Sequence, residues 1–202
     1  MDQINKRIAK LRKSMESHKI DAIIIPSNDP HQSEYVSDDW KARAYFSGFT
    51  GSAGTFVVDN KTAALWTDSR YFLQFEDECK DNEVELFKQS IPHAPEHIEW
   101  IISKLHSHAR LGIDFRLFSA EQVHSLNLLA EQKKIELKDA SAVIEESWEE
   151  RPTPDFDVIL DYKVEFAGVS RTEKINIIKE SLFQNLSDYV LISNLDDIAW
   201  LL

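Results

Sequence analysis

The sequence predicts an α/β fold in which helices flank a mixed β-sheet. Short β-branched or apolar runs alternate with helical patterns, most regularly from residue 83 onward. Hydrophobic residues make up 43% of the chain and charged residues 29%, a balance that is typical of globular proteins. With 202 residues, the chain has room for one domain of ordinary size and part of a second.

The first elements follow from the spacing of apolar residues. Apolar positions at helical spacing predict a helix over 3–18, and a β-branched run predicts a buried strand over 21–27. Two apolar runs, 55–59 and 62–68, are separated by a two-residue turn and predict a hairpin. The elements that we expect next are helix 70–80, strand 83–89, helix 96–108, strand 110–115, helix 119–132 and strand 134–139.

The pattern changes near residue 150, where prolines and acidic residues interrupt every period. We interpret 1–150 as the first domain and 151–157 as a linker. Residues 158–202 then resemble the incomplete start of a second, similar domain, because its few elements cannot bury both faces of a strand. The elements that we expect there are helix 170–185, strand 188–193 and a helix or turn over 194–202.

Three of the five glycines lie close together, at Gly48, Gly51 and Gly54. Their spacing is not that of a dinucleotide-binding motif, and no Lys-Ser/Thr follows the last glycine as in a P-loop. The segment also leads into a strand, whereas phosphate binding needs the start of a helix. We therefore predict a tight turn into the strand, with positive φ at one or more of these glycines.

Two stretches carry candidate site residues. Asp68 and Arg70 lie at a strand-to-helix junction. In one interpretation, Asp68 orients the guanidinium of Arg70 outward. In the other, Asp68 or Ser69 caps the helix and Arg70 is only solvated. The spacing favours neither interpretation. In residues 31–49, the aromatic and basic side chains could form a surface for a partner, or could pack within a long loop. Those side chains are Trp40, Arg43, Tyr45 and Phe46.

Composition excludes several classes of protein. The net charge of −12 argues against a nucleic-acid binder, and no run approaches the roughly 20 apolar residues of a membrane span. Cys79 is the only cysteine, so neither a disulfide framework nor a thiolate metal cluster is expected. The first residues predict a charged amphipathic helix and not a signal peptide, which favours a cytoplasmic protein.

Five blocks resemble, in order and spacing, the amino-terminal part of Xaa-Pro aminopeptidases of the cytosolic three-domain type, in the creatinase/prolidase superfamily. The blocks are IIIPSNDPHQSEYV, RAYFSGFTGSAGTFVV, AALWTDSRYFLQ, WEERPTPD and NLDDIAWLL. This resemblance implies a creatinase/prolidase N-terminal-like domain followed by the truncated start of a related domain. The family's catalytic domain, which binds two metal ions, usually Mn²⁺, would be absent from this chain.

The resemblance also implies a function and a set of residues. Family members use a hydroxide held between two metals to release the residue that precedes proline, and they commonly form homodimers. The resemblance implies that Arg70 is the family's substrate-contacting arginine and that Asp68 orients its side chain. Ser69 occupies a position at which glycine is common in the family. His31, Glu34 and Tyr35 are secondary candidates at the same edge. We expect no catalytic or metal-binding residue in this chain, and the alternative function is a stand-alone protein-interaction module.

Overall fold

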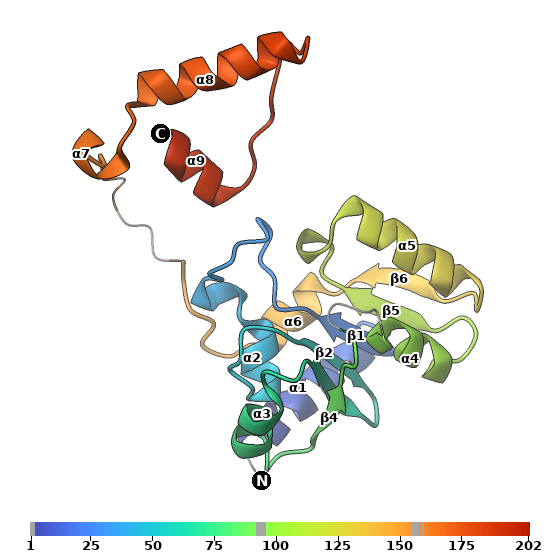
Figure 1. The fold of residues 1–202 in the computed structure, drawn as a ribbon. Helices are drawn as coiled ribbons and strands as arrows, with labels where there is room; N and C mark the ends of the chain where they lie inside the picture. The colour runs from blue at the N-terminus through green and yellow to red at the C-terminus, as the bar shows by residue number, and fades with distance from the viewer. Residues whose placement is uncertain (1–2, 92–95, 155–157, 159) are drawn as a thin grey trace.

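The computed structural model describes residues 3–91, 96–154, 158 and 160–202. Its centre is one mixed sheet, which confirms the predicted fold class (Figure 1). Within the described residues the sheet has six strands: β1 (Ala22–Ile25), β2 (Thr55–Asp59), β3 (Ala63–Thr67), β4 (Val84–Lys88), β5 (Arg110–Ile113) and β6 (Glu136–Asp139).

The strands are arranged in the order β4-β3-β2-β1-β5-β6. Strand β2 pairs antiparallel with β1 and β3, whereas β3–β4, β1–β5 and β5–β6 are parallel pairs. The carboxyl ends of β1, β3, β4, β5 and β6 therefore meet at one edge, together with the amino end of β2. Because loops at this edge follow five of the six strands, it is where an open α/β sheet usually presents its ligand-binding residues.

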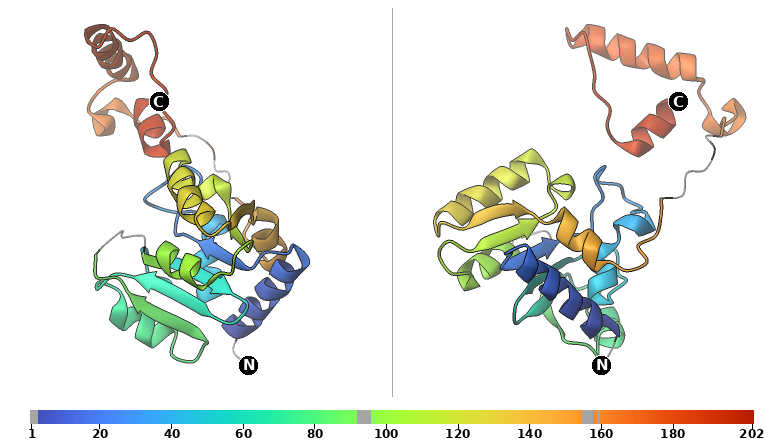
Figure 2. Two further views of the ribbon diagram at one scale, coloured as in Figure 1. Left: turned by 90° about the vertical axis from the view of Figure 1, so that its right-hand side faces the viewer. Right: turned by 180° about the vertical axis from the view of Figure 1, so that it is seen from behind.

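Helices cover both faces of the sheet (Figures 1 and 2). One face packs against α1 (Gln3–Ser17), α2 (Ala42–Ser47), α3 (Phe72–Glu78) and α6 (Ser141–Ser147). The other face packs against α4 (Glu96–Lys104) and α5 (Ala120–Glu131). Two short 3₁₀ helices, η1 (Asp38–Trp40) and η2 (Phe115–Leu117), lie in the connections. Strand β1 is buried on both faces, as its run of β-branched residues predicts.

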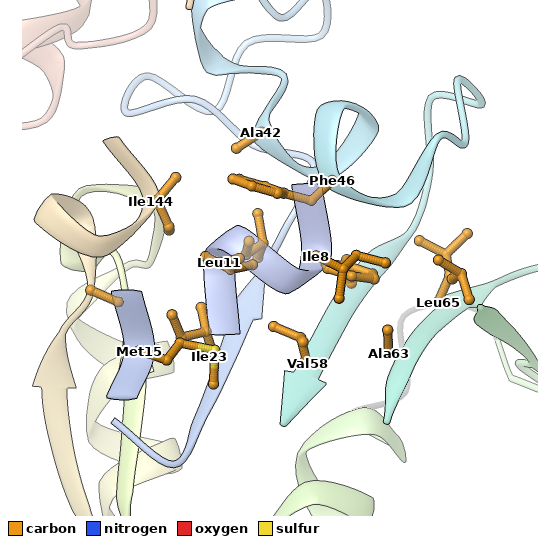
Figure 3. Close-up of a cluster of buried hydrophobic side chains, with 14 of the residues drawn as sticks. Ile8, Leu11, Met15, Ile23, Ala42, Phe46, Val58, Ala63, Leu65 and Ile144 are labelled. Atoms are coloured by element: carbon orange, nitrogen blue, oxygen red, sulfur yellow. The ribbon is translucent and has the colours of Figure 1, made fainter. Parts of the chain in front are cut away.

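Helix α1 supplies much of the first core. Ile8, Leu11 and Met15 recur at helical spacing, and each is completely buried against the sheet. Figure 3 shows these side chains gathered with Phe46 of α2 and Ile23 of β1. The amphipathic pattern of the first residues thus determines which face of the helix meets the sheet.

The segment that contains Gly48, Gly51 and Gly54, which we call the glycine segment, leads from α2 into β2. Gly48 ends α2 with a φ of 76°, which confirms the predicted left-handed conformation, and its N–H donates to the carbonyl of Ala44. A Cβ atom on Gly51 would lie 2.2 Å from Cζ of Phe49 and 2.7 Å from Cδ1 of Tyr71. Glycine is therefore required at position 48 by conformation and at position 51 by close approach.

The last part of the chain contains α7 (Val164–Ala167), α8 (Arg171–Gln184) and α9 (Leu195–Leu201), which lie apart from the sheet in Figures 1 and 2. Ser170 caps α8 in a reciprocal capping box with Glu173. The predicted strand over 188–193 is wrong, since no strand forms there. A strand needs a partner for its backbone hydrogen bonds, and no strand of the described residues lies beside this segment.

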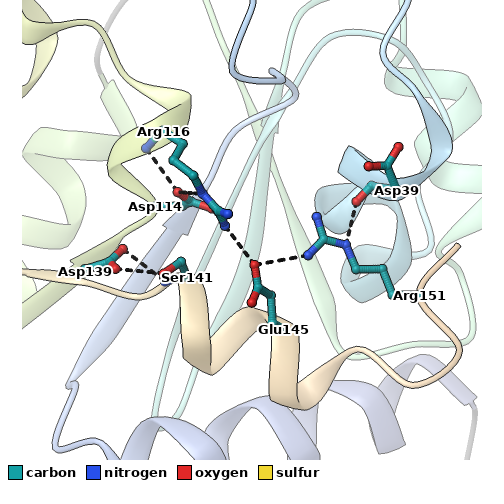
Figure 4. Close-up of polar contacts among 7 residues, drawn as sticks. All are labelled: Asp39, Asp114, Arg116, Asp139, Ser141, Glu145 and Arg151. Atoms are coloured by element: carbon teal, nitrogen blue, oxygen red, sulfur yellow. Dashed lines mark hydrogen bonds and ion pairs between the residues drawn. The ribbon is translucent and has the colours of Figure 1, made fainter. Parts of the chain in front are cut away.

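A charged network joins α6 to Arg151 and to Arg116, which follows β5 (Figure 4). Oε1 of Glu145, on α6, forms ion pairs with Nη2 of Arg116, at 2.9 Å, and with Nη1 of Arg151, at 3.3 Å. Arg151 also donates from Nε to the carbonyl of Asp39, and both guanidinium groups stack near the ring of Trp40. Residue 151, at the predicted start of the linker, is thereby held against α6 and η1.

A Glu145→Gln variant is expected to lower the free energy of unfolding by about 0.5–1 kcal/mol, because the network is partly exposed to solvent. The loss should shrink in high salt, which screens the pairs that the wild type retains. Urea denaturation at low and high salt measures both effects. Glu85→Gln is the matched control, since Glu85 is exposed and makes no ion pair in the described part of the chain. An equal loss in the two variants would contradict the role assigned to the network.

Candidate functional site

The candidate site begins where β3 ends. Asp68 directly follows the last strand residue, and Arg70 lies two positions further on. The Arg70 side chain donates from Nε to Oδ1 of Asp68 and from Nη2 to Oδ2, both at 2.8 Å. The backbone N–H of Arg70 also donates to Oδ1, at 3.1 Å. This bidentate pair fixes the plane of the guanidinium relative to the sheet.

The two partners differ in exposure. The Asp68 side chain is 12% exposed, whereas that of Arg70 is 64% exposed. The hydrogen bonds that Arg70 donates to the carboxylate of Asp68 raise the pKa of Arg70 above its ordinary value, so the guanidinium stays charged. Its Nη1 group makes no hydrogen bond to the described residues. Helix α3 has Tyr71 as its N-cap without a side-chain cap bond, so the helix-cap interpretation of Asp68 and Ser69 is not what the geometry shows.

The same geometry recurs at the end of β5, a feature that the sequence reasoning missed. Asp114 follows β5, and Arg116 donates to it from Nε at 2.9 Å and from Nη2 at 2.7 Å. The sequence signal was present, because an Asp-x-Arg triplet follows an apolar strand in both places. Arg116 differs from Arg70 in that it also binds Glu145, so it serves the internal network.

The glycine segment lies directly beside the Arg70 turn. The hydroxyl of Tyr71 hydrogen-bonds that of Ser52 at 2.6 Å, and Thr67 donates to the carbonyl of Ala53 at 2.7 Å. Ser27, which follows β1, donates to the carbonyl of Gly54 at 2.6 Å. These hydrogen bonds connect the carboxyl ends of β1 and β3 to the glycine segment, which lies between them at the same edge of the sheet.

The secondary candidates occupy the neighbouring loop. Glu34 and Tyr35 line a pocket of about 470 Å³ to which Ser52 also contributes. His31 is separate from that pocket, and its Nδ1 lies 3.2 Å from the carbonyl oxygen of Ser193. Asp29 holds the backbone of this loop, because its Oδ1 accepts hydrogen bonds from the N–H groups of residues 31 and 33. The structure thus places Glu34 and Tyr35 beside the glycine segment and pairs Asp68 with Arg70. His31 instead contacts the last part of the chain.

The hypothesis of an aromatic–cationic surface within residues 31–49 is wrong for two of its four side chains, Arg43 and Phe46. Arg43 is only 6% exposed and Phe46 is completely buried, because the segment folds into α2 and turns both side chains inward. Arg43 donates to the carbonyls of Phe49, at 2.8 Å, and Gly51, at 2.5 Å. For these two side chains the interpretation as internal packing holds, in a helix and not in a long loop, whereas Trp40 and Tyr45 are half-buried.

His97, in the first turn of α4, is a further residue that the sequence reasoning did not select. Its Nδ1 atom is buried and has no hydrogen-bond partner among the described residues. Burial lowers the pKa of His97 to about 4, so its imidazole is neutral near pH 7.

Because the native pKa of His97 lies below the ordinary value near 6.5, protonation favours the unfolded chain between these two values. We expect the free energy of unfolding to fall by about 2 kcal/mol more in the wild type than in His97→Phe when the pH is lowered from 7 to 4.5. Urea denaturation at several pH values measures this. His124→Phe, at an exposed position on α5, should keep the wild-type dependence; identical pH profiles for the wild type and His97→Phe would contradict the prediction.

The described residues contain no group of three or more His, Cys, Asp or Glu side chains arranged to hold a metal ion. Among the helices described, none has the length and apolar character needed to cross a bilayer.

Comparison with known proteins assigns the family. A family model described as the creatinase/prolidase N-terminal domain matches residues 7–147. The chain belongs to the creatinase/prolidase N-terminal domain family. A second model with the same description matches residues 150–202. The two matches lie on either side of the change in sequence pattern near residue 150.

Curated relatives of this creatinase/prolidase N-terminal chain are named as aminopeptidases. Xaa-Pro aminopeptidase 1 of Dictyostelium discoideum is 36% identical, over 98% of this chain and 33% of the relative. Aminopeptidase P2 of Arabidopsis thaliana is 40% identical, over 91% of this chain and 26% of the relative. The chain therefore spans about a quarter to a third of the length of these relatives.

Solved structures agree with the fold. The X-prolyl aminopeptidase from Caenorhabditis elegans, described as a cytosolic enzyme with a di-nuclear active site, superimposes with a TM-score of 0.86 and 27% identity. The match covers all of this chain and 34% of that one. The N-terminal domain of the peptidase PepQ from Mycobacterium tuberculosis shares the fold, with a TM-score of 0.52 over 71% of this chain.

Proposed function

We propose that this chain is the amino-terminal, non-catalytic part of a Xaa-Pro aminopeptidase, and that Arg70 helps to bind its peptide substrates. The observation that carries the proposal is the exposed guanidinium fixed on Asp68 at the carboxyl edge of the sheet. The names of the relatives support the reaction, since they are aminopeptidases over the same residues. A fixed, charged fork with free N–H groups is suited to a peptide carbonyl or carboxylate.

The chemistry itself is proposed to occur in a further domain of the complete protein. There, two metal ions, which we propose to be Mn²⁺, would supply the hydroxide that attacks the carbonyl before proline. The di-nuclear site described for the Caenorhabditis elegans relative supports this assignment. Residues 1–202 would restrict access to that site, bind part of the peptide and support a homodimer in the cytoplasm.

In the complete enzyme, Arg70→Ala is expected to lower kcat/KM for a Xaa-Pro peptide by about tenfold or more, mainly through KM, since a hydrogen bond to a charged group contributes about 1.5–3 kcal/mol. Metal content should not change. Arg116→Ala is the matched control, because it breaks an Asp-x-Arg pair of the same geometry that is directed to Glu145. An Arg70→Ala enzyme with the kinetic constants of the wild type would show that Arg70 has only a structural role.

The proposal that catalysis occurs in a further domain can be tested separately. The 202-residue chain alone, supplied with Mn²⁺, is expected to leave a Xaa-Pro dipeptide uncleaved, while the complete enzyme cleaves it. Metal-stimulated release of the first residue by the short chain would refute the assignment of catalysis to a further domain.

A further inference from the structure

The ring of Tyr71 lies next to the guanidinium of Arg70, with the arginine Cζ 5.2 Å from the ring centroid. This distance is within the range of a cation–π contact. The side chain of Arg70 is 64% exposed. An exposed ion pair such as the one with Asp68 is weak, because water competes for the charge and ordering a long side chain costs entropy. A second contact on the guanidinium therefore favours the rotamer that binds Asp68 over the alternatives.

The Tyr71 ring is itself held in place. The backbone N–H of Tyr71 donates to the carbonyl of Asp68 at 3.0 Å and closes the turn between them. The ring packs edge-on to Phe49, with centroids 5.9 Å apart, and its hydroxyl is hydrogen-bonded to that of Ser52 at 2.6 Å. A Cβ atom on Gly51 would lie 2.7 Å from Cδ1 of the ring, so the glycine makes room for it. The glycine segment therefore determines where the ring lies.

The second Asp-x-Arg pair, at the end of β5, has an aromatic contact as well. Cζ of Arg116 lies 5.0 Å from the ring centroid of Trp40. Arg116 is further held by a second carboxylate, that of Glu145, at 2.9 Å. Arg70 pairs only with Asp68 in the described part of the chain. The orientation of Arg70 therefore depends on fewer contacts, and the ring beside it accounts for a larger share of them.

We propose that Tyr71 is a positioning residue for Arg70, and that the glycine segment holds the Tyr71 ring beside the guanidinium. The proposal rests on the proposed function, in which the guanidinium of Arg70 binds the peptide. Tyr71 acts through Arg70 and needs no contact of its own with the peptide. Because a guanidinium that is already ordered loses less entropy when the peptide binds, the effect of Tyr71 falls on KM and not on kcat.

The test is a double-mutant cycle in the complete enzyme, with KM and kcat measured for a Xaa-Pro peptide. Tyr71→Leu removes the ring and should raise KM about fivefold at unchanged kcat. In the Arg70→Ala background the same substitution should leave KM unchanged, because the group that Tyr71 positions is absent. Tyr71→Phe retains the ring and should keep KM within about twofold of the wild-type value.

Tyr45→Leu is the matched control. Tyr45 is also half-buried, and Cζ of Arg7 lies 4.0 Å from its ring centroid, in a pair between α1 and α2. This variant should keep the KM of the wild type. Urea midpoints establish that each variant is folded. If Tyr71→Leu does not fold, Tyr71→Met replaces it, because the flexible methionine side chain fills the space without offering a ring.

The kinetic constants distinguish failure of this proposal from failure of the proposed function. A wild-type KM in Arg70→Ala would refute the role of Arg70 in peptide binding, and the positioning role with it. Where Arg70→Ala does raise KM, an unchanged KM in the folded Tyr71→Leu variant would overturn the positioning role alone. The same conclusion would follow from an equal rise in KM with and without Arg70, or from a rise in Tyr71→Phe as large as that in Tyr71→Leu.

Discussion

Replacing Arg43 with leucine is expected to lower the free energy of unfolding by about 2–4 kcal/mol. The guanidinium donates to the carbonyls of Phe49 and Gly51, and its removal would leave both carbonyl oxygens buried without a donor. Each such orphaned group costs about 1–3 kcal/mol. Leucine regains part of this loss, since burial of the charge is itself unfavourable and lowers the pKa of Arg43 to about 10.

Urea denaturation followed by tryptophan fluorescence measures the loss. Arg43→Lys is the matched variant, because its single ammonium can reach one of the two carbonyls but does not form the fork, and it should lie between wild type and Arg43→Leu. A leucine variant within about 0.5 kcal/mol of the wild type would show that the glycine segment does not depend on Arg43.

Phe46→Ala is expected to cost about 3–5 kcal/mol, the usual range for removing a completely buried phenylalanine. The ring packs edge-on to Tyr45 at 4.9 Å and belongs to the core formed by α1 and the sheet (Figure 3). The alanine variant would leave a cavity between α2 and α1, which the surrounding backbone can fill only in part.

The same denaturation experiment tests this prediction, with Leu73→Ala as the control. Leu73 lies on a short helix too, but its side chain is 82% exposed, so its truncation should change the free energy of unfolding by less than about 0.5 kcal/mol. Phe46→Leu should lose less than the alanine variant, because it leaves a smaller cavity. If Phe46→Ala and Leu73→Ala cost the same, the burial of α2 would not contribute as described.

Elements with a strong period of their own were predictable from the sequence. The helix over 3–18, the buried strand at β1 and the β2–β3 hairpin all follow from apolar spacing and from a short turn. Helix α2 was missed because its six residues are too few to show a clear period. It is stabilised by the burial of Phe46 against α1 and the sheet, which local sequence does not reveal.

The strand predicted over 188–193 illustrates the opposite error. Its β-branched residues favour a strand, but the conformation requires hydrogen bonds from a neighbouring strand. For the candidate site, the separation of two residues allowed an Asp68–Arg70 pair but did not decide between this pair and a helix cap with a solvated arginine. His97 could not be found in this way, because its importance comes from burial beside strand ends that are remote in sequence.

The position of β1 at the centre of the sheet has a consequence for biosynthesis. Its antiparallel neighbour β2 is made soon afterwards, whereas Ala22 and Ile24 pair with Leu111 and Ile113 of β5, which leave the ribosome much later. Contacts so distant in sequence close slowly. One edge of this apolar strand therefore stays open during translation, and we expect the nascent chain to depend on chaperones until β5 has emerged.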